Sequence, residues 1–302
     1  MPDTPRRYTS SDEDSARWAA FAFRDGDIVI STRSKSGTTW MQMICALLIF
    51  QTPDLPAPIA DLSPWLDHLT APLDEVVAKL DAQRHRRFIK THTPLDGVPT
   101  DPRVTYIVVA RHPLDMAVSL YHQGDNIDWE RMAELMGDPP PDTPRAPRRP
   151  LHDWMLDWVN SDDDPVESTD SLPGSMAHLR DAWRRRDEPN LLLVHYQDML
   201  DDLDGQMRMI AGRLGIEVPD GDWPALVEAA TFGRMRARAS DLVPNRSGVL
   251  KDPLAFFRRG ESGAGRVTLT TEEFDRYLAR AAELAPADLL AWLHREGAPV
   301  AG

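Results

Sequence analysis

Short runs of apolar residues alternate with longer stretches of helical periodicity along most of this 302-residue chain. The short runs cover residues 28–30, 104–110 and 191–194, and a shorter one, Phe88-Ile89, lies within a fourth predicted strand at 87–90. Runs of this length, bounded by polar loops, are typical of strands that a parallel sheet buries on both faces. The helical stretches between them would form the covering layers. The pattern therefore predicts an α/β fold, a single domain in which helices flank a mostly parallel central sheet.

Helical periodicity marks much of the remaining chain. The predicted helices cover residues 40–50, 73–82, 114–123, 152–160, 175–186, 203–214, 223–232, 271–284 and 286–295. The stretch at 175–186 is rich in arginine, so we expect it to present a solvated face. Segment 124–150 is rich in Pro, Arg and Asp and is predicted to be a mobile insertion in the position of a lid. The polar residues 1–15 are expected to be disordered, which leaves 16–302 as the domain.

The composition fits one soluble domain. Hydrophobic residues make up 42% of the chain, which is enough for a full core. The longest apolar run, 41–50, is about half of a bilayer crossing, and no apolar run follows the basic residues near the N-terminus. We therefore expect a cytoplasmic protein without membrane insertion. The single cysteine, Cys45, lies on an apolar helix face and is expected in the core.

The net charge of −14 argues against non-specific binding to nucleic acid or to anionic membranes. Five cations nevertheless share one feature, since each lies within two residues of Gly, Ser, Thr or Pro in a loop-like context. They are Lys35, Lys90, Arg111, Arg258 and Arg259. If the fold gathers them, a negative protein acquires a positive pocket.

The sequence Lys35-Ser36-Gly37-Thr38-Thr39-Trp40 connects the first predicted strand to the first long helix. A strand that leads through a Gly- and hydroxyl-rich loop to a helix N-terminus points backbone N–H groups at one spot, which suits a bound phosphate or sulfate. The alternative is an ordinary strand-to-helix turn with Ser and Thr as caps. The loop is P-loop-like but is not a Walker A sequence, because Lys35 precedes the only glycine.

Two further strands end in polar residues. His92 follows the strand at 87–90, with Lys90 on the same strand face, and Arg111 follows the strand at 104–110. Ligands of open α/β sheets bind at the carboxyl edge, so these side chains are candidates for a nucleotide site. The structural alternatives are a satisfied core histidine and an arginine paired with a carboxylate. No zinc spacing is present in the sequence, and no metal is expected.

Five motifs in order resemble the cytosolic sulfotransferases that use 3′-phosphoadenosine 5′-phosphosulfate (PAPS). They are residues 35–40, Lys90-Thr91-His92, residues 111–119, Tyr196-Gln197-Asp198-Met199 and Phe257-Arg258-Arg259-Gly260, and the resemblance covers roughly residues 25–275. It implies PAPS as co-substrate, adenosine 3′,5′-bisphosphate (PAP) as product, and transfer of a sulfuryl group to a hydroxyl or amine without a metal.

The resemblance also implies a role for each matching residue. The 5′-phosphosulfate would be held by Lys35, Ser36, Gly37, Thr38 and Thr39; the adenine by Trp40, Tyr196, Phe232 and Met235; the 3′-phosphate by Arg111, Ser119, Arg258, Arg259 and Gly260. His92 would be the general base of an in-line displacement, since a neutral imidazole can accept the hydroxyl proton. Lys35 would stabilise the leaving phosphate oxygen, with Lys90 near the transferring group.

This sequence departs from the family pattern at several positions. Ser34 replaces a proline, and Ala230-Thr231 replaces a Thr-Ser pair, so one hydroxyl contact to the nucleotide would either be missing or move to Thr231. Residues 263–266 lack the usual tryptophan, which leaves the shape of the closing loop open. No dimerisation motif is recognisable, so no oligomeric state is assigned.

The sequence leaves the identity of the acceptor undecided, and it leaves two alternative functions. Variable segments 53–69, 124–150 and 241–253 would surround the acceptor, and the aromatic and Met residues favour a small, apolar acceptor that is aromatic or lipid-like. The sequence does not separate a phenol, a steroid, a glycolipid and a specialised metabolite. The first alternative function is a nucleoside kinase-like phosphotransferase, which would require a Walker lysine and a magnesium site. The second is a non-catalytic protein that binds adenosine bisphosphate.

Overall fold

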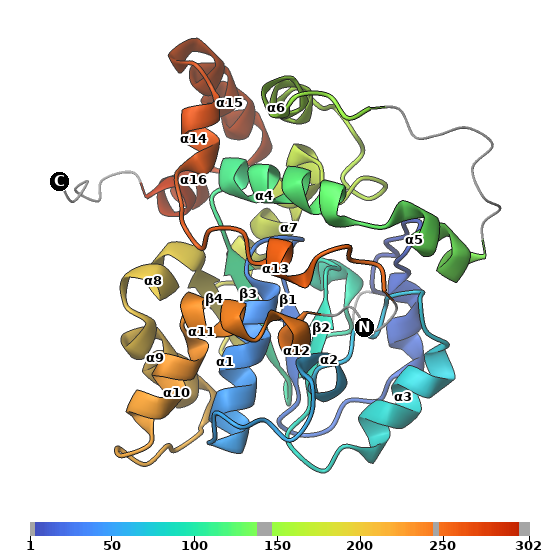
Figure 1. Ribbon diagram of the computed structural model, residues 1–302, viewed down its shortest axis with the longest axis vertical. Helices are drawn as coiled ribbons and strands as arrows, with labels where there is room; N and C mark the ends of the chain where they lie inside the picture. Colours follow the sequence, from blue (N-terminus) through green and yellow to red (C-terminus); the bar gives the residue numbers. More distant parts are fainter. Residues whose placement is uncertain (1–3, 138–146, 244–247, 296–302) are drawn as a thin grey trace.

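The computed structural model describes residues 4–137, 147–243 and 248–295 (Figure 1). A parallel sheet of four strands lies at the centre, with strand order β2-β1-β3-β4. The strands are β1 (Ile28–Ser31), β2 (Phe88–Thr91), β3 (Thr105–Ala110) and β4 (Leu191–His195). This arrangement confirms the predicted fold class, and the four predicted strands are the strands of the sheet.

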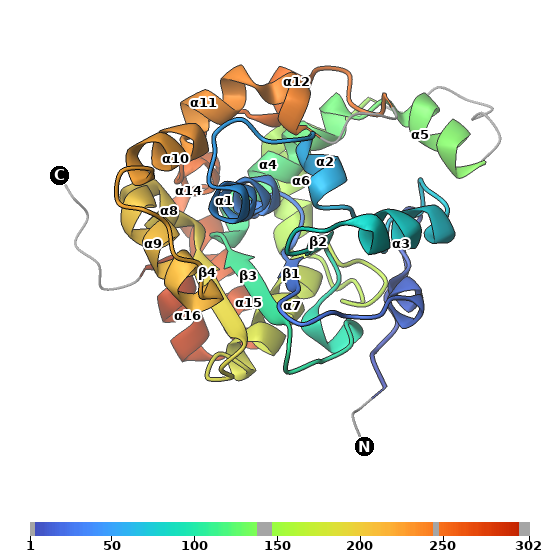
Figure 2. The same ribbon diagram turned by 90° about the horizontal axis from the view of Figure 1, so that it is seen from below.

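Helices cover both faces of the sheet, as Figure 2 shows, with α1 on one side and α7 and α15 on the other. The longer helices are α1 (Thr38–Phe50), α3 (Leu73–Ala82), α4 (Pro113–Asn126), α5 (Trp129–Met136), α6 (Leu151–Val159), α7 (Leu172–Arg184), α9 (Leu203–Leu214), α10 (Trp223–Ala230), α15 (Thr271–Leu284) and α16 (Ala287–His294). The shorter ones are α2 (Ile59–Leu62), α8 (Tyr196–Asp201), α11 (Phe232–Ala237), α12 (Ala239–Leu242), α13 (Pro253–Phe256) and α14 (Ala264–Thr268), with 3₁₀ helices at Ser15–Ala20 and Leu95–Gly97.

Alternate residues of each strand enter two separate cores. In β1, Ile28 and Ile30 pack in the core that contains α1, whereas Val29 packs in the core that contains α7 and α15. Cys45 lies in the first core and is fully buried, as expected. Because side chains in a strand alternate between faces, a continuous apolar run is required to fill both cores, which explains the pattern seen in the sequence.

Helix α7 differs from the prediction of a solvated face. Its arginines at 180 and 184 are exposed, but Leu172, Met176 and Leu179 belong to the second core. The arginines mark only the outer side of an amphipathic helix, and the inner side covers the sheet.

Residues 4–15 are folded, contrary to the expected disorder. Tyr8 is buried, and its hydroxyl donates to Asp96 Oδ1 at 2.8 Å. The backbone N–H of Asp14 donates to the carbonyl of Asp67 at 2.9 Å, and Glu13 pairs with His68 in an antiparallel bridge. Few of these positions are apolar, so the segment is fixed by polar contacts that periodicity does not reveal. Residues 1–3 lie outside the described part of the chain.

Segment 124–150 is only partly described. It begins with the end of α4 and contains α5, and the N–H of Asp128 donates to the carbonyl of Val249 at 2.7 Å. Residues 138–146 lie outside the described residues, so the predicted lid remains a prediction.

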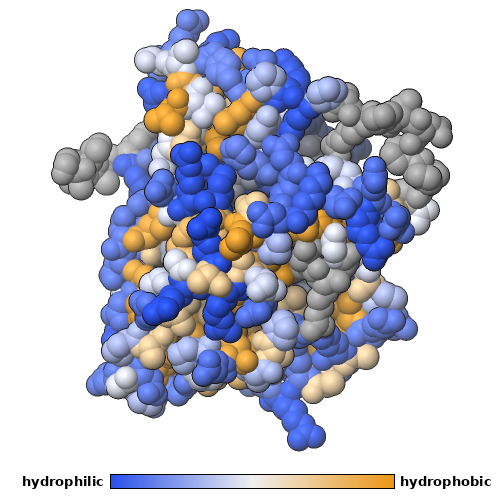
Figure 3. Space-filling model, viewed as in Figure 1, coloured by the Kyte–Doolittle hydropathy of each residue, from blue (hydrophilic) through white to orange (hydrophobic). Residues whose placement is uncertain are grey.

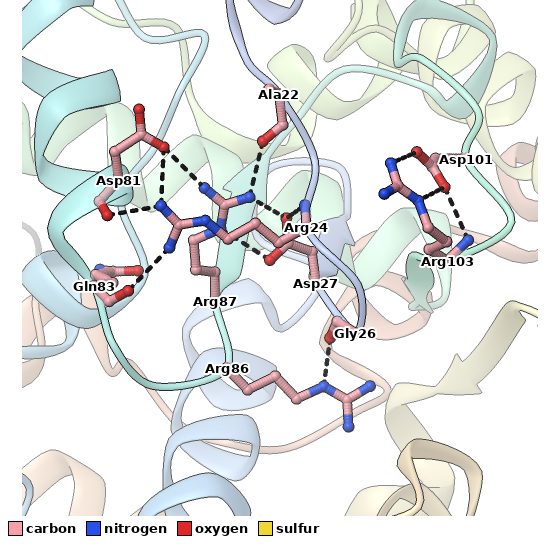
Figure 4. A network of polar contacts seen from close by, with 10 residues as sticks. All are labelled: Ala22, Arg24, Gly26, Asp27, Asp81, Gln83, Arg86, Arg87, Asp101 and Arg103. Carbon is pink, nitrogen blue, oxygen red and sulfur yellow. Dashed lines mark hydrogen bonds and ion pairs between the residues drawn. The ribbon is translucent and has the colours of Figure 1, made fainter.

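A buried ion pair joins the amino ends of β1 and β2 (Figure 4). Arg87 donates to both carboxylate oxygens of Asp27, at 2.9 and 2.5 Å, and to the carbonyl of Ala22 at 2.9 Å. Both charged side chains are almost fully buried, at 1% and 2% exposure. The pair therefore lies at the end of the sheet opposite to the carboxyl edge.

Replacement of Arg87 by alanine should destabilise the protein by about 3–5 kcal/mol, because the Asp27 carboxylate would remain buried without its partner. The matched control is Arg103→Ala, which breaks the solvent-exposed Arg103–Asp101 pair in the same view. We expect that control to leave the urea midpoint nearly unchanged. Equal midpoints for the two variants would contradict a structural role for the buried pair.

Hydrophilic side chains dominate the face seen in Figure 3, with small apolar patches between them. Within the described ranges, no helix combines the length and apolar character required to cross a bilayer.

Candidate active site

The carboxyl edge of the sheet opens into a cavity of about 920 Å³. Most residues that the sequence predicted for the site line this cavity. They are Lys35, Gly37, Thr38, Thr39, Trp40, Lys90, His92, Arg111, Ser119, Tyr196, Phe232, Met235, Arg258, Arg259 and Gly260. Segments more than 200 residues apart in sequence therefore meet at one place, including the five cations expected to form a positive pocket.

Two predicted residues are not on the cavity wall. Ser36 is buried, and its backbone N–H donates to the carbonyl of Arg33 at 3.1 Å. Thr231 caps α11, and its hydroxyl donates to the carbonyl of Glu228 at 2.8 Å. The Thr231 cap also divides the helix predicted at 223–232 into α10 and α11.

The loop between β1 and α1 requires glycine at position 37. Gly37 has φ +109°, and a Cβ atom there would lie 3.0 Å from Cδ2 of Tyr196. Lys35 also adopts a left-handed conformation, with φ +63°. No side chain caps the N-terminus of α1, so the first N–H groups of this helix are available to an anion.

Aromatic side chains connect this loop to the second half of the chain. Trp40 Nε1 donates to the carbonyl of Ala230 at 2.8 Å, and its ring meets Tyr196 edge to face at 5.2 Å. The Arg111 guanidinium lies 4.4 Å from the Tyr196 ring centroid. A flat ligand placed in this part of the cavity would contact aromatic rings and a cation.

Arg111 holds the first loop against the C-terminal loop. Its Nη1 donates to the carbonyl of Lys35 and its Nη2 to the carbonyl of Glu261, both at 3.1 Å. The Nε atoms of Arg111 and Arg258 are buried and have no hydrogen-bond partner among the described residues. Buried guanidinium donors without partners favour a bound anion, because an unsatisfied charged donor is costly.

The closing loop without the tryptophan is held by Asp115, a residue that the sequence did not assign to the site. Its carboxylate accepts hydrogen bonds from the backbone N–H groups of Gly263 and Gly265, each at 2.8 Å. Gly260 has φ +68°, and a Cβ atom there would overlap the Phe232 ring. The position of Asp115 in the first turn of a helix was visible in the sequence, but its partners were not.

Lys35 and Lys90 are both buried and lie near other cations. Lys35 Nζ donates to Gln123 Oε1 at 3.2 Å, and burial together with Arg111 and Lys90 lowers its pKa to about 7. Burial lowers the pKa of Lys90 to about 8, and its Nζ lies 3.5 Å from the Trp65 ring centroid. An anion bound here would stabilise the protonated form of either lysine.

His92 is held as a neutral imidazole with one free nitrogen. Its Nδ1 lies 2.5 Å from the carbonyl of Thr32, which can only accept, so Nδ1 carries the proton and Nε2 the lone pair. Burial, then the charges of Lys90 and Arg33, holds the pKa of His92 well below its ordinary value. A neutral imidazole on a cavity wall can accept a proton from a bound hydroxyl.

Two polar groups that the sequence did not indicate hold the segment around His92. Arg33 donates to the carbonyl of His92 and pairs with Asp170 Oδ1 at 2.6 Å. The buried Asp67 Oδ2 accepts from the hydroxyls of Thr91, at 2.5 Å, and Thr93, at 2.7 Å, on either side of His92. Both contacts join segments that are distant in sequence, so spacing gave no signal for them.

No group of three or more His, Cys, Asp or Glu side chains suited to a metal occurs in residues 4–137, 147–243 and 248–295. The lining residues described above therefore include cations, hydroxyls and aromatic rings but no evident metal ligand set.

Solved structures share this fold. Retinol dehydratase in complex with androsterone and PAP aligns with a TM-score of 0.68 at 21% identity, covering 89% of this chain and 83% of that one. Mouse sulfotransferase SULT7A1, complexed with PAP, aligns with a TM-score of 0.65 at 19% identity, covering 93% and 92%. At these identities the alignments support the fold alone.

Relatives found by sequence have higher identities to this chain than these solved structures do. A glycolipid sulfotransferase of Mycobacterium bovis is 42% identical over 305 residues, covering 95% of this chain and 93% of that protein. Sulfotransferase 1A1 of Canis lupus familiaris is 27% identical over 266 residues, covering 85% and 82%. The family model described as sulfotransferase domain matches residues 25–285. The chain thus belongs to the sulfotransferase domain family and is a sulfotransferase enzyme.

Proposed function

We propose that this enzyme transfers the sulfuryl group of PAPS to a hydroxyl of a glycolipid. The observation that carries the proposal is the meeting, in one cavity, of an open helix N-terminus, unpaired arginine donors and a neutral histidine. The name of the M. bovis relative supports a sugar-bearing lipid as acceptor, which is narrower than the apolar or aromatic molecule expected from the sequence.

The donor would span the cavity from the first loop to the C-terminal loop. Its 5′-phosphosulfate would lie at the N-terminus of α1 beside Lys35, where the helix dipole and the N–H groups favour an anion. Its 3′-phosphate would meet Arg111, Arg258 and Arg259. The adenine would lie near Trp40 and Tyr196, with Phe232 and Met235 also in contact.

The reaction would proceed by in-line displacement. His92 Nε2 would accept the proton of the acceptor hydroxyl as its oxygen bonds to sulfur, while the bond from sulfur to the bridging phosphate oxygen breaks. Negative charge grows on that oxygen, and Lys35 would stabilise it more in the transition state than in the ground state. Lys90 would neutralise charge on the transferring group.

Transfer of radiolabelled sulfate from PAPS tests this function. The purified enzyme should label a lipid that carries a hexose, with a lower KM than for a phenol of similar apolar area. Labelling of the phenol alone would contradict the acceptor assignment, and absence of transfer to either acceptor would contradict catalysis.

Binding of PAP should take up a proton near pH 8. Lys35 has a pKa of about 7 in the free protein, and a bound phosphate would raise that pKa, so the contribution of Lys35 to the affinity should be constant below pH 7 and fall as the pH rises above it. Calorimetry at pH 8 in buffers of different ionisation enthalpy measures the uptake.

The matched control for this prediction is Lys35→Arg, which keeps the positive charge but does not titrate in this range. Proton uptake should decrease in that variant. An unchanged uptake would assign the titration to another group, such as Lys90, whose pKa is about 8.

A further inference from the structure

The folded N-terminal segment supplies part of the cavity wall. Residues 10–13 line the cavity together with His92 and Trp65. The backbone carbonyl of Asp12 accepts from the N–H of Leu69 at 2.8 Å, and Glu13 pairs with His68 across an antiparallel bridge. The side chain of Glu13 is therefore carried by a fixed backbone on the wall that also bears His92.

The carboxylate of Glu13 has no hydrogen bond or ion pair with any residue in the described part of the chain. Neighbouring carboxylates do have partners, since Asp170 pairs with Arg33 at 2.6 Å and Asp12 lies 3.7 Å from His68 Nε2. Burial, and then the charge of Asp67, raises the pKa of Glu13 well above its ordinary value. A shielded carboxyl group that faces a cavity gains most from a hydrogen bond to a ligand.

The position of Glu13 relative to His92 follows from a chain of contacts: Glu13 pairs with His68, the His68 ring centroid lies 4.1 Å from that of Trp65, and the Trp65 ring centroid lies 4.6 Å from that of His92. Among the groups that act on Lys90, Glu13 is the first carboxylate, ahead of Asp67 and Asp12. Arg33, which donates to the carbonyl of His92, in turn acts on Glu13. Glu13 therefore lines the same cavity as His92 and Lys90, and within the described residues it forms no ion pair with Lys90 or Arg33.

The cavity wall contains a second polar group without a hydrogen-bond partner in the described residues. Other residues that line the cavity are apolar. Trp65 Nε1 is buried without a hydrogen-bond partner among the described residues. The apolar lining residues outside the expected donor region include Ile127, Met132, Val249 and Leu250. The cavity thus combines a carboxylate and an N–H donor near His92 with an apolar lining suited to hydrocarbon.

We propose that Glu13 determines acceptor specificity by accepting a hydrogen bond from a hydroxyl next to the one that is sulfated. This inference rests on the proposed function and narrows it to acceptors with a polyhydroxylated head group, such as a sugar ring. A sugar presents adjacent hydroxyl donors, whereas a phenol or a simple alcohol presents only the reacting hydroxyl. The hydrocarbon part of the acceptor would contact the apolar lining.

The test compares Glu13→Leu with the wild-type enzyme on two acceptors, a hexose-bearing lipid and a phenol. The variant should raise KM for the sugar acceptor about tenfold, the effect of one lost hydrogen bond, and leave KM for the phenol and the Kd for PAP unchanged. Glu13→Gln, whose amide oxygen still accepts, should keep KM for the sugar acceptor within about threefold of the wild type. The control is Glu272→Leu on the exposed face of α15, which should alter none of these constants.

Two results would overturn the inference and leave the proposed function intact. One is an unchanged KM for the sugar acceptor in Glu13→Leu, and the other is an equal rise for both acceptors, which indicates a general structural effect. Wild-type enzyme that sulfates the phenol but no sugar-bearing lipid would overturn the glycolipid assignment and this inference together.

Discussion

Replacement of His92 by alanine is expected to lower kcat by about 10³-fold or more while PAP binds with nearly unchanged affinity. The hydrogen bond from Nδ1 to the Thr32 carbonyl directs the lone pair of Nε2 away from the backbone, and no other neutral base is assigned beside the transferring group. Without the imidazole, the acceptor hydroxyl would have to lose its proton to water. The contacts proposed for the donor lie at the first and last loops, so donor binding should survive.

Single-turnover kinetics with radiolabelled PAPS and calorimetry with PAP would measure the two effects separately. The control is His152→Ala, on α6 outside the cavity lining, which should leave both constants unchanged. Parallel loss of transfer and of PAP binding in His92→Ala would show that His92 has a structural role or contacts the donor. The pKa of His92 lies well below its ordinary value, so this base stays neutral until the pH is well below 6.5. The wild-type rate should therefore decrease through protonation of His92 only below that range.

Simultaneous replacement of Arg258 and Arg259 by alanine is expected to raise the Kd for PAP about 100-fold or more, since charge-assisted hydrogen bonds to phosphate are among the strongest in proteins. Arg258 Nε is buried without a partner among the described residues, and the neighbouring charges of Arg259 and Arg111, after burial, lower the Arg258 pKa. A phosphate would relieve both the missing hydrogen bond and the mutual repulsion of the cations.

Adenosine 5′-monophosphate provides the matched ligand for this experiment because it lacks the 3′-phosphate. The double variant should bind it about as weakly as the wild type does. An equal loss of affinity for both nucleotides would indicate that the arginines shape the loop. An unchanged Kd for PAP would mean that they do not contact the 3′-phosphate.

Local pattern was sufficient to predict the sheet and to identify Lys35, Lys90, His92 and Arg111 as candidates for a site at its carboxyl edge, and these residues line the cavity there. The strands carry apolar residues on both faces because they are buried on both faces, and each is followed by the loop that reaches the carboxyl edge. Lys35, His92 and Arg111 therefore follow strands in the sequence and meet in space. The C-terminal Arg258-Arg259-Gly260 does not follow a strand, and it was placed only by its resemblance to a known motif.

Long-range polar contacts were not predictable from the sequence. Asp67 holds the threonines on either side of His92, and Arg33 donates both to the His92 carbonyl, 59 residues away in sequence, and to Asp170, 137 residues away. A single polar residue has no periodicity, so its partner is known only once the chain is folded. The same reason explains why disorder was predicted for residues 1–15. Polar contacts fold the described part of this segment, residues 4–15, against the domain.

A crystal structure of the enzyme with bound PAP would test the central claim most directly. We expect the 5′-phosphate within hydrogen-bond distance of the N-terminus of α1 and Lys35, the 3′-phosphate at Arg111 and Arg258, and His92 Nε2 facing open space beside the 5′-phosphate. Density for PAP outside this cavity, or in the reverse orientation with the 3′-phosphate next to His92, would contradict it.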